Sequence, residues 1–341
     1  MNNRKQLKVI IIGMGKMGKI RLDAMQRHGG FEVVGLCDND LSALQNYDYP
    51  KFDNWRICIE ETKPDVVVVC TINLVIPDIV CYALEHGCHV FSEKPPGRNL
   101  GDALRMRECH SNASSLVLKF GFNHRYHNSI IEAKALIDSG ILGKPVFVRG
   151  VYGKAGNTNY ANEWRNNPML SGGGILLDQG IHMLDLIRYF LGDISEVFSS
   201  IDNLVWKEIP TEDSAYIVFK TKNGEIASLH STCIQWKHKF DMDIICDKGY
   251  IALNGILTST QSYGEERITF YKKDLQLASG KLGNPIEYTM CFDTDSSWDL
   301  EIGEFYDSIV FKKPVLNGTD NDAVEVMRLI DKIYRNNDRR I

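Results

Sequence analysis

The stretch that decides the fold runs from Leu7 to Asp38 and reads LKVIIIGMGKMGKIRLDAMQRHGGFEVVGLCD. Val9–Ile12 is a short apolar run rich in β-branched residues, which predicts a buried strand. Lys19–His28 is predicted to be a helix that a pair of glycines ends, and Phe31–Cys37 is predicted to be a second strand. The loop between the first strand and the helix has the pattern G-x-G-x-x-G.

Each glycine of this loop has a separate physical task. Gly13 permits a tight turn, Gly15 lets a pyrophosphate approach the backbone, and Gly18 lets the helix pack against the strand. The helix N-terminus offers N–H groups and a partial positive charge to phosphates. Asp38 ends the second strand, where a carboxylate can accept hydrogen bonds from ribose hydroxyls. The order of these elements predicts a dinucleotide site, with contacts from Gly13, Met14, Gly15, Lys16, Met17, Gly18, Asp38 and Asn39.

Length and composition indicate an ordinary globular protein of two domains. The chain has 341 residues, 44% hydrophobic and 24% charged, and a single core seldom grows to that length. The net charge of -5 gives no reason to expect nucleic acid or an anionic membrane as a partner. The longest later apolar run, Val66–Ile72, is too short to span a bilayer.

The number and spacing of the cysteines indicate the redox state of the cellular compartment. There are nine, an odd number, without a C-x-x-C pair or a spacing typical of zinc sites. This pattern predicts reduced thiols in apolar positions, a cytoplasmic protein and no bound metal.

Two different patterns divide the chain. In residues 1–123 strands alternate with helices, which predicts a doubly wound parallel α/β sheet. A short helix is predicted within Asn39–Tyr49, and Asn99 is the predicted N-cap of a helix over Leu100–His110. Residues 124–341 hold a series of strand candidates with Asn-Gly and Lys-Gly turns, a helix at Ile175–Leu191 and two closing helices. They are predicted to form an α+β domain whose mixed, mostly antiparallel sheet carries helices on one face. The strand candidates are Val146–Gly153, Glu196–Val205, Ser214–Thr221, Glu225–Ile234, Phe240–Cys246 and Tyr250–Leu253.

A sheet covered on one side leaves its other face open. The strand Ser214–Thr221 carries apolar residues on both faces, with Ile217 and Phe219 on one and Tyr216 and Val218 on the other. We therefore expect a homodimer or homotetramer joined through this sheet.

Glu93-Lys94-Pro95 follows a predicted strand of the first domain. Ligands of open α/β sheets bind outside the carboxyl ends of the strands. A lysine held there can polarise a carbonyl or hydroxyl group. The alternative is a solvated lysine in a proline-rich loop, but the position favours a functional role.

Asp178 and His182 lie four residues apart on an otherwise apolar helix that follows three glycines. They share one face of that helix. They are either an internally satisfied pair or a general acid/base histidine beside a carboxylate that orients it or the substrate. Zinc is less favoured, since no third ligand stands at a suitable spacing.

Taken in order, the glycine loop, Glu93-Lys94-Pro95, the stretch Gly121–Tyr126 and Asp178-x-x-x-His182 resemble the glucose–fructose oxidoreductase/inositol dehydrogenase family, over essentially the whole chain. Enzymes of that family use NAD or NADP to oxidise a ring hydroxyl of a sugar, cyclitol or nucleotide sugar, or to reduce the ketone. The resemblance implies catalytic roles for Lys94, Asp178 and His182, with Glu93 and Lys94 also beside the cofactor. The substrate contacts it implies are Lys94, Asn123, Arg125, Trp164, Arg165, Asp178 and His182.

One loop departs from the family pattern. Many members carry Thr-Pro-Asn and then histidines after the third parallel strand, whereas this chain has Thr71-Ile72-Asn73-Leu74-Val75-Ile76. The usual histidine is missing, and Thr71 and Asn73 are the cofactor contacts that we predict from this loop.

These inferences predict an NAD(H)-dependent oxidoreductase of a sugar-like substrate bound between the domains. Asp38 would repel a 2′-phosphate and no arginine follows it, which favours NAD over NADP. His182 is the predicted base, with Asp178 and Lys94 positioning the oxygen. Two alternatives stay open: a glycoside hydrolase that uses NAD transiently for oxidation–elimination, and a non-catalytic nucleotide-sensing protein. The combination of these three side chains argues against the second.

Overall fold

The computed structural model describes residues 5–156, 159–258, 260–273 and 285–338. Its contacts divide the chain into two compact units. The first unit comprises Met1–Asn123, Met169–Gly172 and Ser297–Arg328, and the second comprises His124–Pro168, Gly173–Ser296 and Leu329–Ile341. The predicted boundary after residue 123 is the first of these breaks. Residues 297–328 group with the first unit, so these units differ over that segment from the domains 1–123 and 124–341 expected from the sequence.

The first unit is built on a six-stranded parallel sheet in the order β3-β2-β1-β4-β5-β6. The central strand β4 consists of four valines, all buried, as a strand covered on both faces requires. The doubly wound α/β prediction is confirmed. The strands are β1 (Leu7–Ile12), β2 (Phe31–Cys37), β3 (Lys51–Phe52), β4 (Val66–Val69), β5 (His89–Glu93) and β6 (Leu118–Gly121).

Two of the helices between these strands, α2 and α4, begin at asparagine side chains that cap them. Asn54 accepts hydrogen bonds from the first-turn N–H groups of α2, and Asn99, the predicted cap of α4, accepts one from the Asp102 N–H. The predicted short helix after Asp38 is a 3₁₀ turn, Leu41–Leu44. The α-helices are α1 (Lys16–His28), α2 (Trp55–Thr62), α3 (Ile76–Glu85), α4 (Leu100–Asn112) and α8 (Ser297–Val310).

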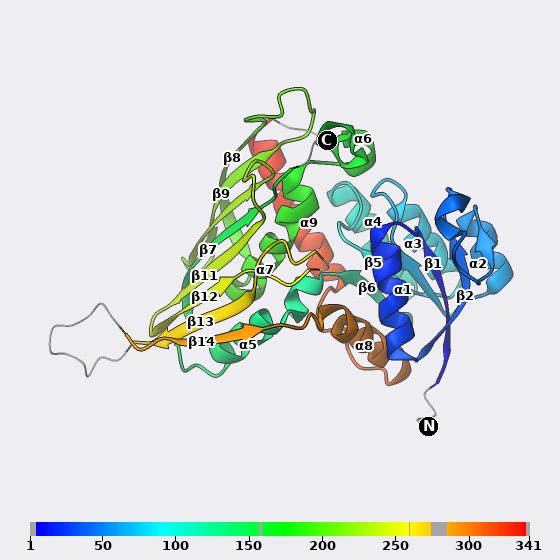
Figure 1. Cartoon of the computed structure of the whole chain (residues 1–341), viewed down its shortest axis with the longest axis horizontal. Coiled ribbons are helices and arrows are strands. Elements are labelled where there is room, and N and C mark those ends of the chain that lie inside the picture. The colour runs from blue at the N-terminus through cyan, green and yellow to red at the C-terminus, as the bar shows by residue number, and fades with distance from the viewer. Residues whose placement is uncertain (1–4, 157–158, 259, 274–284, 339–341) are drawn as a thin grey trace. The chain divides into compact units, whose positions relative to one another are not determined.

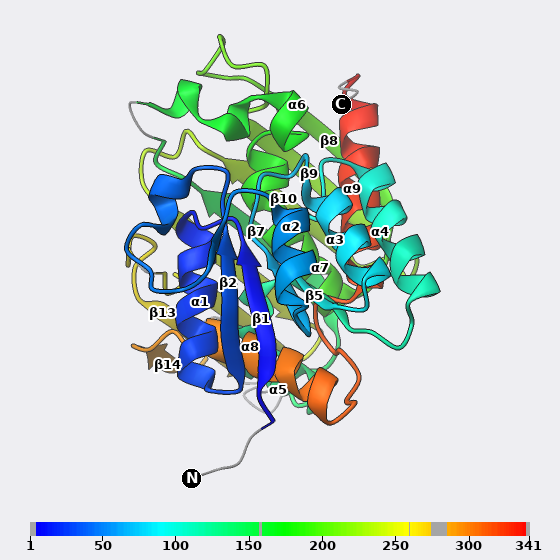
Figure 2. The same ribbon diagram turned by 90° about the vertical axis from the view of Figure 1, so that its right-hand side faces the viewer.

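Helix α8 belongs to this unit because its apolar face completes the unit's core. Phe305 and Tyr306 are buried there. The ring of Phe305 lies 5.5 Å from that of Phe91 on β5, and Tyr306 lies 5.6 Å from Phe31 on β2. Figure 2 shows α8 beside the end of α1 that lies farthest from the glycine loop. Sequence periodicity predicts such a helix but not the core that it covers.

The second unit is built on an eight-stranded sheet in the order β14-β13-β12-β11-β7-β10-β9-β8. The pair β10–β7 is parallel and the other pairs are antiparallel, which confirms the predicted mixed sheet. The last two strands were not among the predicted ones. The strands are β7 (Pro145–Gly153), β8 (Ile194–Asp202), β9 (Ser214–Thr221), β10 (Ile226–Thr232), β11 (Lys239–Cys246), β12 (Gly249–Asn254), β13 (Glu266–Lys272) and β14 (Tyr288–Phe292).

Helices cover one face of this sheet (Figure 1), with α5 (Asn128–Asp138) on β12 and β13 and α7 (Ile181–Leu191) on β7 and β10. The predicted helix Ile175–Leu191 has a π-helical turn, Leu176–Gly180, before α7. A Cβ at Gly180 would lie 2.9 Å from the Ser231 hydroxyl, so glycine lets this turn approach β10. The remaining helices are α6 (Pro168–Ser171) and α9 (Asp320–Asn336), each with residues in both units.

The prediction that every cysteine is a reduced thiol is wrong for one pair. Cys81 on α3 and Cys109 on α4 form a disulfide, with Cα atoms 5.5 Å apart. Their sequence separation of 28 residues gives no sign that the two helices pack together. The other seven cysteines are free.

None of the helices in the described residues is long and apolar enough to cross a membrane. In the same residues no three His, Cys, Asp or Glu side chains are grouped as metal ligands would be.

Candidate functional site

The glycine loop has the geometry that its sequence predicts. Gly13 has a φ of +92°, and a Cβ there would lie 2.5 Å from the Cys70 carbonyl oxygen. A Cβ at Gly18 would lie 2.0 Å from the Gly13 carbonyl oxygen, so only glycine allows α1 to pack this closely. A Cβ at Gly15 would meet nothing within 4 Å. The loop is closed toward the protein and open above Gly15.

Asp38 shapes this loop as well as lying beside it. Its carboxylate accepts a hydrogen bond from the Met14 N–H at 2.7 Å and another from the Asp40 N–H at 3.0 Å. A carboxylate has about four acceptor positions, so capacity remains for two ribose hydroxyls. Asn39, the next residue, and Lys16 of the glycine loop are exposed, whereas Met14 is buried.

These features fit a dinucleotide. No side chain caps the N-terminus of α1, which leaves its first-turn N–H groups for phosphate oxygens. The space above Gly15 and the partly exposed Asp38 carboxylate suit a pyrophosphate and a ribose.

The loop after β4 is held by hydrogen bonds to residues of α6 (Pro168–Ser171). The buried Asn73 side chain donates to the Ser171 carbonyl oxygen at 2.6 Å, and the Leu74 N–H donates to the Leu170 carbonyl oxygen at 3.1 Å. Thr71 is half-buried at the start of the loop. The amide nitrogen of Asn73 therefore helps to fix the conformation of the loop. Cofactor contacts from Thr71 and Asn73 stay a prediction.

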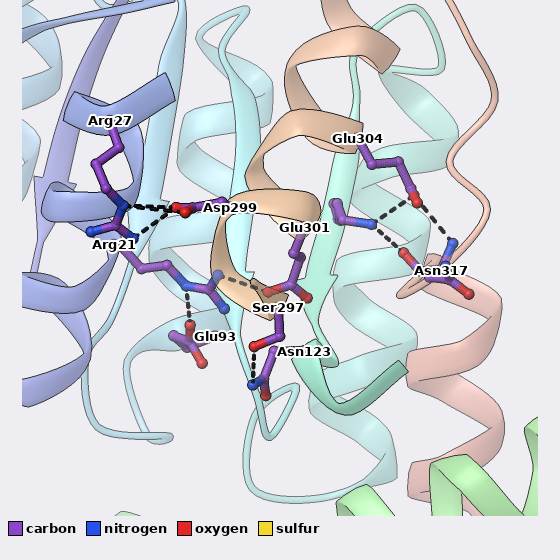
Figure 3. A network of polar contacts seen from close by, with 10 residues as sticks. Arg21, Arg27, Glu93, Asn123, Ser297, Asp299, Glu301, Glu304 and Asn317 are labelled. Carbon is purple, nitrogen blue, oxygen red and sulfur yellow. Dashed lines mark hydrogen bonds and ion pairs between the residues drawn. The ribbon is translucent and has the colours of Figure 1, made fainter. Parts of the chain in front are cut away.

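Lys94 follows directly on the end of β5, at the carboxyl edge of the first unit's sheet, and is half-buried. The Lys94–Pro95 peptide bond is cis. The Glu93 side chain, in contrast, is buried and accepts a hydrogen bond from Arg21 Nε at 2.6 Å (Figure 3). Any contact of Glu93 with a cofactor would therefore come from its backbone.

In the second unit, Asp178 lies between two cations. One carboxylate oxygen is 3.3 Å from Lys154 Nζ and the other is 3.2 Å from Arg165 Nε. The Arg165 guanidinium lies 4.6 Å from the ring centroid of Trp164. The structure thus brings three predicted residues together: Trp164, Arg165 and Asp178. Lys154 is an addition that no sequence motif marks.

His182, at the start of α7, is 5% exposed. Its ring stacks on that of His124, with centroids 3.7 Å apart and an interplanar angle of 13°. His124 Nε2 lies 3.0 Å from the hydroxyl oxygen of Tyr152. Burial raises the pKa of Tyr152 well above its usual value, which keeps that hydroxyl protonated. His124 lies in the Gly121–Tyr126 motif, but the motif gives no sign of this stacking.

Arg125 and Asn123 are buried in polar contacts of their own. The Arg125 guanidinium donates two hydrogen bonds to Asp185, at 2.7 and 2.6 Å. This bidentate pair fixes the Asn123–Tyr126 turn to α7. The Asn123 amide lies 3.4 Å from the Ser297 hydroxyl. Substrate contacts from Asn123 and Arg125 remain predictions.

An exposed indole lies on the loop after β10. Trp236 is 61% exposed and has a φ of +56°, a conformation that a bulky residue rarely adopts. The N–H of the preceding Gln235 donates to the Lys154 carbonyl oxygen at 3.2 Å. The loop is thereby joined to the residue that pairs with Asp178.

Comparison with known families places this chain. Residues 7–120 match an oxidoreductase family described as having an NAD-binding Rossmann fold, and residues 130–252 match the GFO/IDH/MocA C-terminal domain. The chain belongs to the GFO/IDH/MocA family. The resemblance that the sequence motifs indicate is confirmed, and so is the prediction of an NAD(P)-dependent oxidoreductase.

Individual members of the family are also similar to this chain. D-glucoside 3-dehydrogenase of Escherichia coli is 34% identical over 196 residues, which span 54% of each chain. Myo-inositol 2-dehydrogenase of Thermotoga maritima is 25% identical over 275 residues, 76% of this chain and 79% of that enzyme. A levoglucosan dehydrogenase structure with NADH has a TM-score of 0.84 at 20% identity, covering 97% of this chain and 96% of that one. It shares the fold.

Proposed function

We propose that this protein is an NAD(H)-dependent dehydrogenase that interconverts a ring secondary hydroxyl and a ketone of a sugar, cyclitol or nucleotide sugar. The observation that carries the proposal is the cluster at the start of α7. A buried imidazole, His182, lies one helical turn from a carboxylate, Asp178, that two cations hold in place. The relatives named for a glucoside and for myo-inositol support this substrate class.

Two residues of the chain have different roles in the proposed oxidation. Removing the hydroxyl proton needs a base within hydrogen-bond reach, and a histidine suits that task near neutral pH. His182 takes this proton. The ammonium of Lys94 donates to the same oxygen and stabilises its developing negative charge. A bound NAD would supply the hydride acceptor for the carbon that carries this hydroxyl.

Asp178 orients the sugar. Carboxylates accept hydrogen bonds from vicinal hydroxyls, and the ion pairs with Lys154 and Arg165 hold Asp178 in one orientation. The exposed face of Trp236 offers an apolar surface to the C–H groups of a sugar ring. Together, Asp178 and Trp236 suit a polyol that has one face less polar than the other.

The first unit binds the cofactor. The glycine loop and the α1 N-terminus hold the pyrophosphate, and Asp38 holds the adenosine ribose. The carboxylate disfavours a 2′-phosphate, so NAD is the preferred cofactor. Asn39, Thr71, Asn73 and the backbone of Glu93 complete the proposed contacts.

A substrate screen tests the proposal. The wild-type enzyme is incubated with free sugars, methyl and aryl glycosides, inositols and nucleotide sugars, with NAD and with NADP, and NAD(P)H absorbance is followed. We expect net NADH formation that Lys94→Ala and His182→Ala abolish. Release of an aglycone without net NADH would identify a glycoside hydrolase instead. Turnover that survives both substitutions would overturn the mechanism.

A further inference from the structure

Arg21 is a charged residue in the interior of the first unit. It lies on α1, the helix that begins at the glycine loop, and its side chain is 0% exposed. The guanidinium lies 4.3 Å from the ring centroid of Phe91 and 4.7 Å from that of Trp298. The two aromatic rings thus supply cation–π contacts to a charge that water does not reach.

Two carboxylates share this guanidinium (Figure 3). Arg21 Nε lies 2.6 Å from Glu93 on β5, and Arg21 Nη1 lies 2.7 Å from Glu301 on α8. Both carboxylates are almost fully buried. A buried charge is tolerated only when it is paired, so the burial of Arg21 depends on these carboxylates.

The two carboxylates are not equivalent. Burial raises the pKa of Glu301 above its ordinary value, although Arg21 and Lys119 act in the opposite direction. Glu93 differs because it ends β5, and the next residue is Lys94.

The backbone of β6 also limits the position of the Arg21–Glu93 pair. A Cβ at Gly121, the last residue of β6, would lie 2.9 Å from Arg21 Nη2 and 3.2 Å from both carboxylate oxygens of Glu93. The ion pair thus crosses directly over this glycine. The end of β5 is held between α1 and β6 with little freedom to shift.

We propose that Arg21 is a positioning residue: through Glu93 it fixes the end of β5 and thereby the orientation of Lys94. The inference rests on the proposed catalytic role of Lys94. Glu301 and Trp298 secure Arg21 but have no covalent link to the lysine. The sequence signals Lys94 by its motif, whereas nothing in the sequence of α1 marks Arg21 as its support.

The test compares two matched substitutions. Each replaces one of the carboxylates that contact the Arg21 guanidinium, Glu93 or Glu301, by the corresponding amide. Glu93→Gln is expected to lower kcat by about tenfold or more, since small displacements of a reacting group have effects of that size. Because only the backbone of Glu93 is among the proposed cofactor contacts, the Kd of this variant for NAD should change less than about threefold. Glu301→Gln should keep kcat within about twofold. Arg21→Lys, which keeps the charge, should retain more kcat than Arg21→Met.

A second readout does not depend on the substrate. The rate of reductive methylation of Lys94, followed by mass spectrometry as a function of pH, reports the environment of its amine. Glu93→Gln should shift this profile, and Glu301→Gln should leave it in place. Thermal unfolding of each variant identifies losses due to misfolding.

The outcomes separate the inference from the proposed function. If both amide variants lower Tm alike and leave kcat and the Lys94 profile as in the wild type, the cluster is only structural and the inference is wrong. If Lys94→Ala keeps its activity, the proposed catalytic role fails, while the methylation profile still decides whether Arg21 and Glu93 position Lys94.

Discussion

At the scale of single residues, Asp38 makes the choice between the two nicotinamide cofactors testable. Its carboxylate would repel a 2′-phosphate, so we expect kcat/KM with NAD to exceed that with NADP by at least tenfold, about 1.4 kcal/mol. Asp38→Ser should narrow this gap. It should also raise KM for NAD, because the carboxylate holds the Met14 N–H of the glycine loop. Steady-state kinetics with both cofactors measures both effects.

Asn39→Ala is the control for this substitution. Asn39 is the exposed neighbour of Asp38, and its loss should leave the preference for NAD in place. Equal or reversed kcat/KM values in the wild-type enzyme would contradict the assignment of Asp38.

His182 carries the second prediction at this scale. His182→Ala should lower kcat by roughly 10²–10⁴ and leave the Kd for NAD within a few fold. The wild-type kcat/KM for oxidation should rise with pH through a group at about 6–8, and this limb should vanish in the variant. Kinetics across pH and a binding titration provide the measurements.

His124→Phe is the matched control, since it keeps an aromatic ring against His182 and removes the second imidazole. It should retain the pH limb and most of kcat. If Lys94→Ala removes the limb and His182→Ala retains it, the two residues have exchanged roles and the mechanism is wrong.

At the scale of elements, the sequence predicts those features that local chemistry determines. The glycine loop, the Asn99 cap and the alternation of strands and helices each follow from neighbouring residues. The burial of Arg21, the stacking of His124 on His182 and the pairing of Lys154 with Asp178 do not. Each of these depends on a partner far away in the chain, and a single sequence carries no record of that contact.

The same reason explains the errors in the elements themselves. The disulfide Cys81–Cys109 follows from the packing of α3 on α4, and the place of α8 follows from the core around Phe91. The π-turn before α7 depends on the close approach of Gly180 to β10. Strand β14 is a short edge strand with mostly exposed residues, so it lacks the alternation of a half-buried strand.

The junction of α4 with α9 yields a prediction about stability. His110 in the last turn of α4 pairs with Asp320 at the start of α9, Nδ1 to Oδ2 2.9 Å. The hydrogen bond to Asp320 raises the pKa of His110, and the same bond lowers the pKa of Asp320. The histidine's contribution is complete below its unfolded pKa of about 6.5 and is lost as pH rises through the folded value. The aspartate's contribution is lost as pH falls through its own folded value.

His110→Gln should therefore lower Tm most at about pH 5–6, by roughly 2 °C. The difference from the wild type should shrink as the pH rises above neutrality. Differential scanning calorimetry of both proteins between pH 5 and 9 checks this. A difference that is constant with pH would mean that the pair contributes by packing and not by charge.

At the scale of the whole molecule, the exposed face of the eight-stranded sheet bears on assembly. Phe198, Tyr216 and Val218 are 63, 54 and 46% exposed. They lie on adjacent strands, with Phe198 paired to Val218 in the register of β8 and β9. Helices α5 and α7 pack on the opposite face. A group of exposed apolar side chains of this kind on a sheet is typical of an interface.

We therefore expect a homodimer or homotetramer in which this face meets the same face of a second copy, since a two-fold axis pairs like with like. Light scattering at micromolar concentration should give a mass of two or four chains. Val218→Glu would place two like charges near the axis and should shift the protein to monomer. Ile57→Glu, on the exposed side of α2 in the first unit, adds the same charge away from the sheet and should leave the mass unchanged. A wild-type monomer, or a Val218→Glu variant that assembles as well as the wild type, would show that this sheet face is not the interface.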